Sequence, residues 1–404
     1  MKRKLLTILL AVTVTATMSF AGISTVFADS GNTSVSGATG RLTSALSQKA
    51  TTSDAAATPI TIENGAVITP ASANASSVTT YMTPTYSSGS PVLVYPIQAK
   101  KGGLSITFTG ANCTAYSSLY SDSQCSNSVT YNSNSSDSST GVKGHYYSIK
   151  TNGTYYLKFS LYSFSGSGAG VFAVQHAPSG GTLTNGKAMM GGSASKDSVS
   201  YYKVKVPATG YITLVMASPS DYSSTFRVKL TNSGKKTLFS GYESLNSSGS
   251  YTTRIGVKKG TYYIGVKSYN AVYAIGSKFT KVSCSKHGTS KSKAVTIKKG
   301  VTRKGVLAAS SSASDWYKIR LTRSQAVSIA ITAKSSAGGD IGGNIKFTIY
   351  NSSGSYTSDT LTGVSNNTMK PYTVGNGSKL TKGTYYIKVS RNHKGNGYYT
   401  LKWK

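Results

Sequence analysis

Three stretches of this chain share one pattern: TNGTYYLKF at 151–159, KKGTYYIGV at 258–266 and TKGTYYIKV at 381–389. Each stretch places a glycine after a polar or basic residue and then alternates bulky side chains with other residues. This pattern is typical of a turn that leads into a half-buried strand. A spacing of roughly 110 residues is too long for a solenoid unit and fits tandem copies of one small domain.

Two further landmarks recur in the same order around these strands. Each copy begins with a short strand that ends in a glycine turn, and an aromatic strand follows it. The first landmark lies at 60–65, 181–186 and 295–300, and the second at 94–97, 201–206 and 316–321. Apolar side chains keep a period of two along these segments. We therefore predict an all-β fold of three tandem antiparallel β-sandwiches.

The start of the chain has a different composition. A basic start, an apolar run and Val26-Phe27-Ala28 indicate a signal peptide over 1–28, which predicts a secreted protein. Small and polar residues then predict a flexible spacer over 29–58. The three repeats are predicted at 59–178, 179–285 and 286–404, and the first is divergent, with a Ser-rich insertion at 116–141. No later stretch approaches the ~20 apolar residues of a membrane span. The first cysteine after the signal peptide is Cys113 and residues 401–404 do not resemble a sorting tail, so we expect any cell-wall association to be non-covalent.

Three cysteines in an exported chain allow one disulfide and leave one thiol. Cys113 and Cys125 lie in one Ser-rich segment, and a local bridge between them is the favoured pairing. The alternative is that all three cysteines are unpaired, since sandwiches of this size need no such staple.

Positive charge increases along the chain. Lys and Arg number 5 against 3 acidic residues over 59–178, 14 against 3 over 179–283, and 20 against 3 over 284–404. A field of this kind attracts polyanions and weakens with salt. The excess of cations therefore indicates an anionic partner, with nucleic acid only as a non-specific polyanion.

The third repeat resembles a known family, the bacterial pre-peptidase C-terminal domain. Its motifs are met by Asp315-Trp316-Tyr317, by the strand from Ile345 to Ile349, and by Gly383 to Val389. The second repeat matches less well and the first weakly. The resemblance implies small jelly-roll-like sandwiches that act as non-catalytic modules of secreted peptidases, some of which bind calcium, collagen or polysaccharide.

Alternation also predicts which side chains face outward. In the second and third repeats it places aromatic rings and cations on the same outer face, where rings can stack on sugars and cations can neutralise phosphate or carboxylate. The predicted polyanion-binding residues are Tyr201, Lys203, Lys205, Arg227, Lys229, Tyr263, Lys267, Trp316, Lys318, Arg320, Lys346, Tyr386 and Lys388. The alternative is that these side chains only solvate the sheet and discourage edge pairing.

Enzymatic motifs are absent from the sequence, which holds no H-E-x-x-H and no G-x-S-x-G. Cys284 and His287 are close in sequence but lie between two repeats, so we expect no catalysis there. Calcium needs several oxygen ligands, and Asp315 and Asp197 each lack a second carboxylate nearby in sequence. We therefore predict no cofactor, with calcium as the alternative, and expect Asp315 to accept hydrogen bonds at a turn or cap.

Together these observations predict a secreted, non-catalytic protein that binds an anionic cell-wall polymer or an acidic polysaccharide. One alternative is a structural or adhesin-like matrix protein whose charge serves solubility. Another, which follows only from the family resemblance, is an accessory module for a secreted peptidase partner.

Overall fold

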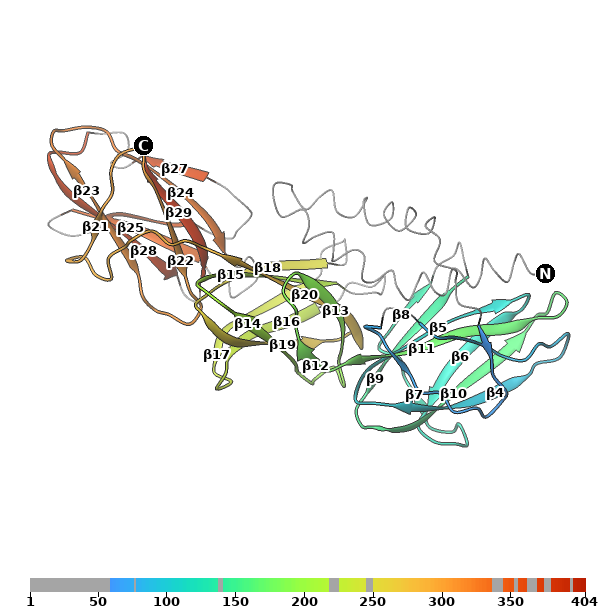
Figure 1. The fold of residues 1–404 in the computed structure, drawn as a ribbon. Coiled ribbons are helices and arrows are strands. Elements are labelled where there is room, and N and C mark those ends of the chain that lie inside the picture. The colour runs from blue at the N-terminus through green and yellow to red at the C-terminus, as the bar shows by residue number, and fades with distance from the viewer. Residues whose placement is uncertain are drawn as a thin grey trace.

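The computed structural model describes residues 59–404, apart from 76–77, 137–140, 218–224, 245–249, 336–343, 352–354, 362–368, 374–378 and 393–394. Strands and turns make up this part of the chain, which confirms the predicted all-β class (Figure 1). The predicted signal peptide and spacer lie outside the described residues. Among the residues that the structure describes, none forms a helix long and apolar enough to cross a membrane.

The first group of strands forms two sheets, which we call the first sandwich. One sheet has the order β1-β3-β11-β5-β9-β8, with β2 paired to β11, and the other has the order β4-β10-β6-β7. The strands are β1 Ile60–Thr61, β2 Ala71–Ser72, β3 Thr80–Met82, β4 Val92–Ala99, β5 Gly102–Ala111, β6 Thr114–Tyr120, β7 Ser128–Val129, β8 Ser133–Ser136, β9 Lys143–Ile149, β10 Gly153–Tyr162 and β11 Ala169–Pro178.

The second and third sandwiches each pair a five-stranded sheet with a four-stranded one. In the second the orders are β12-β14-β19-β16-β17 and β13-β20-β15-β18, and in the third β21-β23-β28-β25-β26 and β22-β29-β24-β27. The strands of the second sandwich are β12 Gly180–Thr182, β13 Lys187–Gly192, β14 Ser200–Val206, β15 Gly210–Ala217, β16 Thr225–Asn232, β17 Thr237–Ser244, β18 Ser250–Val257, β19 Gly260–Ser268 and β20 Val272–Lys281. Those of the third are β21 Val295–Thr296, β22 Thr302–Leu307, β23 Asp315–Leu321, β24 Ser328–Ser335, β25 Asn344–Tyr350, β26 Ser355–Leu361, β27 Met369–Thr373, β28 Gly383–Asn392 and β29 Gly397–Trp403.

Each repeated GTYY stretch is an inner strand of its sheet: β10 lies between β4 and β6, β19 between β14 and β16, and β28 between β23 and β25. We call these three sheets the GTYY sheets and their partners the joint sheets. In each sandwich the two sheets bury one apolar core between them. The predicted boundaries at 178 and 285 fall between the strand groups, and independent folding of each group stays a prediction.

The first tyrosine of each GTYY stretch fixes the turn that precedes it. The hydroxyl of Tyr262 donates a hydrogen bond to the carbonyl of Lys258 at 2.9 Å. Tyr155 makes the same bond to Thr151 at 3.3 Å, and Tyr385 to Thr381 at 3.2 Å. Because the ring belongs to the strand and the carbonyl to the turn, this contact sets where the strand begins.

The cores of the second and third sandwiches each contain a pair of tyrosines whose hydroxyl groups are hydrogen-bonded to each other. The hydroxyls of Tyr202 and Tyr273 are 3.0 Å apart, and those of Tyr317 and Tyr399 are 2.8 Å apart. Glycine makes room for one ring of each pair, because a Cβ atom on Gly191 would lie 2.2 Å from the Tyr202 hydroxyl oxygen. On Gly305 a Cβ atom would lie 2.3 Å from the hydroxyl oxygen of Tyr399.

The joint sheets connect the three sandwiches. Between the first and second, Asn74 donates to the carbonyl of Met190 and accepts from its amide, at 3.0 and 2.6 Å. Small and apolar side chains of both sandwiches are buried around these contacts. Gly192 approaches Gly103 so closely that a Cβ atom would lie 2.2 Å from the Gly103 nitrogen.

The joint between the second and third sandwiches has a similar construction. The amide of Gly256 on β18 donates to the side chain of Asn396 at 2.8 Å, and its carbonyl accepts from the amide of Ala309 at 2.8 Å. A Cβ atom on Gly256 would lie 2.7 Å from the nitrogen of Gly397. Backbone therefore packs on backbone at both joints, through the sheets that lie opposite the GTYY sheets.

Two predictions about the first repeat are wrong. Part of the predicted Ser-rich insertion is strand β6, which pairs with β10 along its whole length. The predicted Cys113–Cys125 disulfide is not formed, since both cysteines, like Cys284, are free. The seven residues of β6 lie between Cys113 and Cys125 and hold them roughly 20 Å apart along the strand, too far for a bridge.

We expect the change Gly191→Ala to lower the free energy of unfolding of the second sandwich by about 1–3 kcal/mol, because the Tyr202 ring is fully buried and cannot move away from the added methyl group. Urea denaturation followed by circular dichroism measures this change. The matched control is Gly234→Ala in an exposed turn, where the nearest atom would lie 3.5 Å away. Equal stability of the two variants would contradict the packing described above.

Candidate functional site

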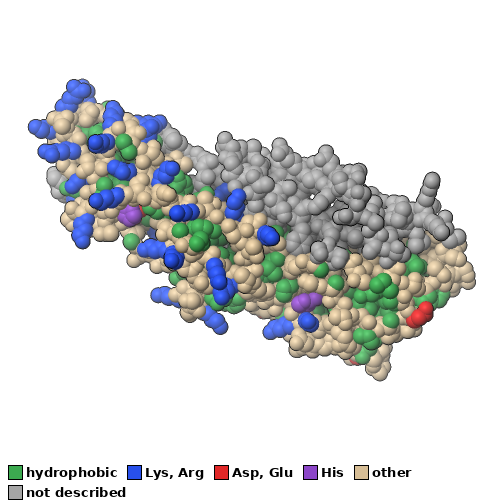
Figure 2. Space-filling view, viewed as in Figure 1, with side chains coloured by type: hydrophobic (Ala, Val, Ile, Leu, Met, Phe, Trp, Pro, Cys, Tyr) green, Lys and Arg blue, Asp and Glu red, His purple; other side chains and the backbone are tan. Residues whose placement is uncertain are grey.

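The outer faces of the second and third GTYY sheets carry the predicted site residues. Strand β14 buries Tyr202, Val204 and Val206 and turns the residues between them outward, and β23 does the same with its own apolar residues. All thirteen predicted side chains belong to the part of the chain that the structure describes, and all are half-buried or exposed. Figure 2 shows that Lys and Arg gather over the second and third sandwiches and are few over the first.

On the second sandwich, a lysine and a tyrosine meet across a glycine. Lys229 of β16 and Tyr201 of β14 lie on either side of Gly265 in β19, in register with it. The Lys229 Nζ atom lies 5.0 Å from the centre of the Tyr201 ring, a cation–π distance. A Cβ atom on Gly265 would lie within 3.0 Å of both side chains, so the glycine lets them lie flat across the strand.

Other cations surround this pair on the same face. Lys203 is directly opposite Tyr263 in register, and Lys205 follows it at the exposed end of β14. Arg227 is exposed and lies opposite Lys267. The face therefore combines two aromatic rings with five cations from three adjacent strands.

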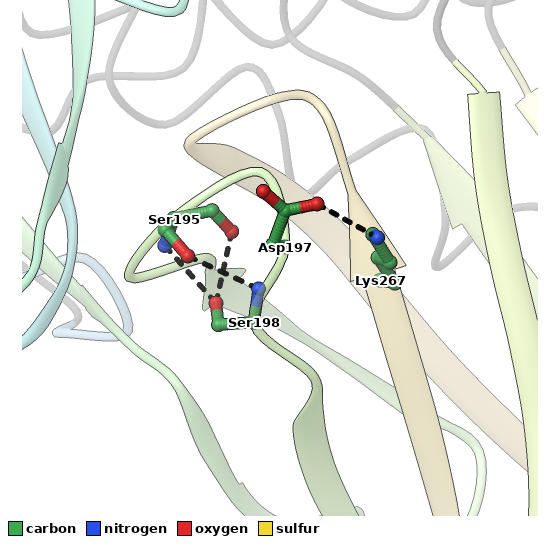
Figure 3. A network of polar contacts seen from close by, with 4 residues as sticks. All are labelled: Ser195, Asp197, Ser198 and Lys267. Atoms are coloured by element: carbon green, nitrogen blue, oxygen red, sulfur yellow. Dashed lines mark hydrogen bonds and ion pairs between the residues drawn. The ribbon is translucent and has the colours of Figure 1, made fainter.

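One of these cations has an acidic partner. Lys267 Nζ lies 2.9 Å from Asp197 Oδ1 (Figure 3), and the hydrogen bond from Lys267 lowers the pKa of the aspartate. The turn that carries Asp197 is closed by hydrogen bonds between Ser195 and Ser198. Lys267 is therefore partly neutralised, which reduces its contribution to the field of the face.

The third sandwich brings three rings together. The Trp316 ring lies 5.5 Å from that of Tyr350, and Lys388 Nζ lies 5.5 Å from the Trp316 ring. Lys291 Nζ lies 5.6 Å from the Tyr350 ring and 5.1 Å from the Tyr386 ring. We call these five residues the aromatic cluster.

Two members of the aromatic cluster were not predicted. Tyr350 follows the predicted strand by one residue, so alternation carried one position further would have found it. Lys291 lies before β21, where its ammonium donates to the carbonyl of Asn351 at 3.2 Å, and no strand pattern places it there.

The remaining predicted residues of the third sandwich lie around the aromatic cluster. Lys318 is opposite Tyr386 in register, Arg320 is exposed at the end of β23, and Lys346 lies opposite Ser390. Together with Lys291 and Lys388 they provide five cations around three rings. This arrangement can contact an anionic chain at several points while a sugar ring stacks on an aromatic face.

The Cys284 and His287 pair does not have the geometry of a nucleophile and its base. His287 Nδ1 lies 3.1 Å from the carbonyl oxygen of Ser285, and His287 Nε2 lies 3.4 Å from Asp315 Oδ1. Cys284 is exposed, but partial desolvation of its thiol raises the pKa of this group, and the charge of Asp315 adds to the effect. An activated cysteine needs a lowered pKa, so this arrangement does not favour nucleophilic chemistry.

Asp315 is buried in the core and does not serve a turn or cap, which corrects the prediction. The Tyr399 hydroxyl donates a hydrogen bond to Asp315 Oδ2 at 2.5 Å. The Tyr317 hydroxyl is in turn hydrogen-bonded to the Tyr399 hydroxyl. Asp197, the other carboxylate weighed as a calcium ligand, is paired with Lys267. Among the described residues, no group of three or more His, Cys, Asp and Glu side chains could hold a metal ion.

Comparisons with known proteins give only distant structural likenesses. Models of known protein families give no match, and neither do curated protein sequences. The pre-peptidase C-terminal domain of a collagenase from Bacillus anthracis is 19% identical, covers 27% of this chain and 93% of its own, and has a TM-score of 0.20. The N-terminal CBM22-1-CBM22-2 tandem domain of Xyn10C from Paenibacillus barcinonensis is 8% identical, covers 55% of this chain and 87% of its own, and has a TM-score of 0.17. Likenesses this distant carry no argument, so membership in the pre-peptidase C-terminal family stays a prediction.

We expect Asp315→Asn to change how stability depends on pH. Burial raises the pKa of Asp315 above its ordinary value of 3.8, although the Tyr399 hydrogen bond and the charges of His287 and Lys258 oppose this effect. The folded state therefore holds this proton more tightly, and the resulting stabilisation is full below pH 3.8 and is lost as pH rises through the raised pKa. The melting temperature of the wild type, relative to Asp315→Asn, should rise as pH falls from about 7 toward about 4.

The control for this experiment is Asp122→Asn, which should have the opposite effect. Backbone hydrogen bonds from Ser126 and Asn127 lower the pKa of Asp122, so its stabilisation is present above the ordinary pKa and is lost as pH falls. If the wild type and Asp315→Asn show the same pH dependence, Asp315 does not hold its proton in the way that the burial indicates.

Proposed function

We propose that the outer faces of the second and third GTYY sheets bind an anionic extracellular polymer, either a cell-wall polyphosphate or an acidic polysaccharide. The observation that carries the proposal is the aromatic cluster, in which Lys291 and Lys388 lie over three partly exposed rings. Each ring face and each ammonium group is close enough to its neighbours for one polymer segment to contact both.

The charge distribution supports a polyanion over a neutral ligand on these two faces. Cations exceed acidic residues by eleven over 179–283 and by seventeen over 284–404. Pairing of Lys267 with Asp197 on the second face offsets only a small part of this excess. Such a field speeds the approach of an anionic chain and retains it at moderate salt.

Binding by rows of strand residues requires no catalytic machinery, and we propose that the protein is not an enzyme. We further propose that it is secreted and held on the cell wall by this binding. Retention by many weak contacts would be reversible and would respond to ionic strength.

A structural role is the second candidate, and the joints favour it. Asn74 and Asn396 each bond to backbone groups of the neighbouring sandwich, and glycine pairs bring the backbones into contact. Connections of this kind suit a spacer or matrix protein. Self-association that persists at high salt would support this role over polymer binding.

The proposed function predicts a salt-dependent affinity that depends on the outer cations. The variant with Lys203, Lys205, Lys318 and Arg320 all changed to Gln should bind long-chain polyphosphate on the order of 100-fold more weakly at about 0.15 M salt, if each cation contributes one released counterion. Titration calorimetry at several salt concentrations measures both the affinity and its salt slope.

The matched control removes four cations that lie away from the outer residues of the GTYY sheets: Lys281, Lys286, Lys304 and Lys404, each changed to Gln. These side chains are all exposed, and the variant has the same net charge as the first one. Equal losses in the two variants would show that net charge alone attracts the polymer and would contradict a specific face. Binding by the wild type that ignores salt would contradict the proposal as a whole.

A further inference from the structure

The outer face of the first GTYY sheet has the same backbone as the other two but different chemistry. The second tyrosine of the repeat marks the equivalence. Tyr156 lies between Pro96 and Tyr120 in register, Tyr263 between Lys203 and Thr231, and Tyr386 between Lys318 and Tyr350. From this tyrosine, the strand registers assign each outward residue of one face to an equivalent residue on the other two.

This matching shows that the first face has no cation where the second has five. On β4 of the first sandwich, Pro96 and Gln98 occupy the positions of Lys203 and Lys205. On β6, Tyr116 and Ser118 occupy those of Arg227 and Lys229, and on β10 Ser160 occupies that of Lys267. One lysine, Lys158, occupies the position of Gly265. The face is therefore polar and aromatic with little charge.

Four tyrosines lie on this face, and two of them form a stacked pair. The rings of Tyr116 and Tyr162 lie 5.4 Å apart with their planes 17° from parallel. Tyr116 is 51% exposed, so much of its ring remains open to solvent. In the view of Figure 2, hydrophobic side chains gather over the area where Figure 1 labels β6 and β10.

Two lysines lie beside these rings and can serve as hydrogen-bond donors. Lys143 Nζ is 4.7 Å from the Tyr116 ring, and Lys158 Nζ is 5.9 Å from the Tyr120 ring. Tyr116 and Tyr120 are four residues apart on one strand, roughly 13 Å. Serine hydroxyls and the Gln98 amide lie among the rings, so apolar ring faces alternate with groups that can bond to hydroxyls.

We propose that this outer face of β4, β10 and β6 binds an uncharged polysaccharide, whose sugar rings stack on Tyr116, Tyr120 and Tyr162. A pyranose ring has an apolar face and a rim of hydroxyl groups, which matches the alternation of aromatic and hydrogen-bonding groups. The scarcity of charge selects against the polyanion proposed for the other two faces. The protein would then join a neutral glycan to an anionic polymer.

The test measures depletion of the full mature chain from solution by insoluble cellulose and by chitin in about 1 M NaCl, where binding through the cationic faces is screened. We expect the wild type to be depleted by at least one of these glycans. The double variant Tyr116→Ala with Tyr120→Ala should bind at least about tenfold more weakly, because each stacking ring contributes separately. A thermal melt of this variant confirms that it is folded.

Two controls distinguish stacking on this face from binding elsewhere on the protein. Tyr131→Ala removes a comparably exposed tyrosine that stacks on His145 of β9 instead of on this face, and it should bind as the wild type does. The variant with Lys203, Lys205, Lys318 and Arg320 changed to Gln should also keep glycan binding, so failure of the polyanion proposal would leave this inference standing.

Three results would overturn the inference. The first is that neither glycan depletes the wild type, and the second is that the double tyrosine variant binds as tightly as the wild type. The third is that the wild type self-associates at the same high salt concentration, as detected by sedimentation velocity, and that the double tyrosine variant does not. This result would assign the face to a second copy of the chain.

Discussion

The alternation of side chains along each GTYY strand is the constraint on which the rest of this structure depends. One side of the strand enters the core, where its first tyrosine also fixes the preceding turn through a hydrogen bond to a carbonyl four residues earlier. The other side must then face outward. Because the joints use the opposite sheets, the same outward positions recur in all three sandwiches and are available for binding.

The three outer faces differ in charge on a common backbone. The second and third combine rings with several cations. The first has Val94 at the position of the Tyr201 and Trp316 rings and Lys158 at the position of Lys388, and it places proline, glutamine, serine and tyrosine where the second has its five cations. Burial of the core restricts which residues the inward positions accept, while the outward positions are free to vary. Differences between the repeats therefore concentrate on the faces that we propose to bind ligands.

Local periodicity is enough to predict the aromatic strands and the GTYY strands of the second and third sandwiches and the direction of their side chains. Tyr317, Ile319 and Leu321 are buried and the residues between them are not, as alternation requires. Prediction fails where local composition conceals a strand: the serines of β6 resemble those of a loop, so the pattern predicts an insertion there and a disulfide across it.

Long-range contacts could not be predicted from periodicity. Lys291 contacts the rings of the aromatic cluster from a loop. Asp315 accepts a hydrogen bond in the core from Tyr399, which is 84 residues away in the sequence. The joints likewise depend on glycines whose role appears only when two sandwiches are in contact, as with Gly192 and Gly103. These features arise from the tertiary arrangement, which the two-residue alternation of side chains along a strand does not encode.

The fluorescence of Trp316 during titration with polyphosphate tests the central claim most directly. The chain has two tryptophans, and changing the buried Trp403 to Phe leaves Trp316 as the single reporter within the aromatic cluster. We predict a saturable change in its emission at about 0.15 M NaCl that disappears at about 1 M NaCl, where the cations are screened. An unchanged emission at both salt concentrations, while calorimetry detects binding, would place the polymer elsewhere and contradict the account.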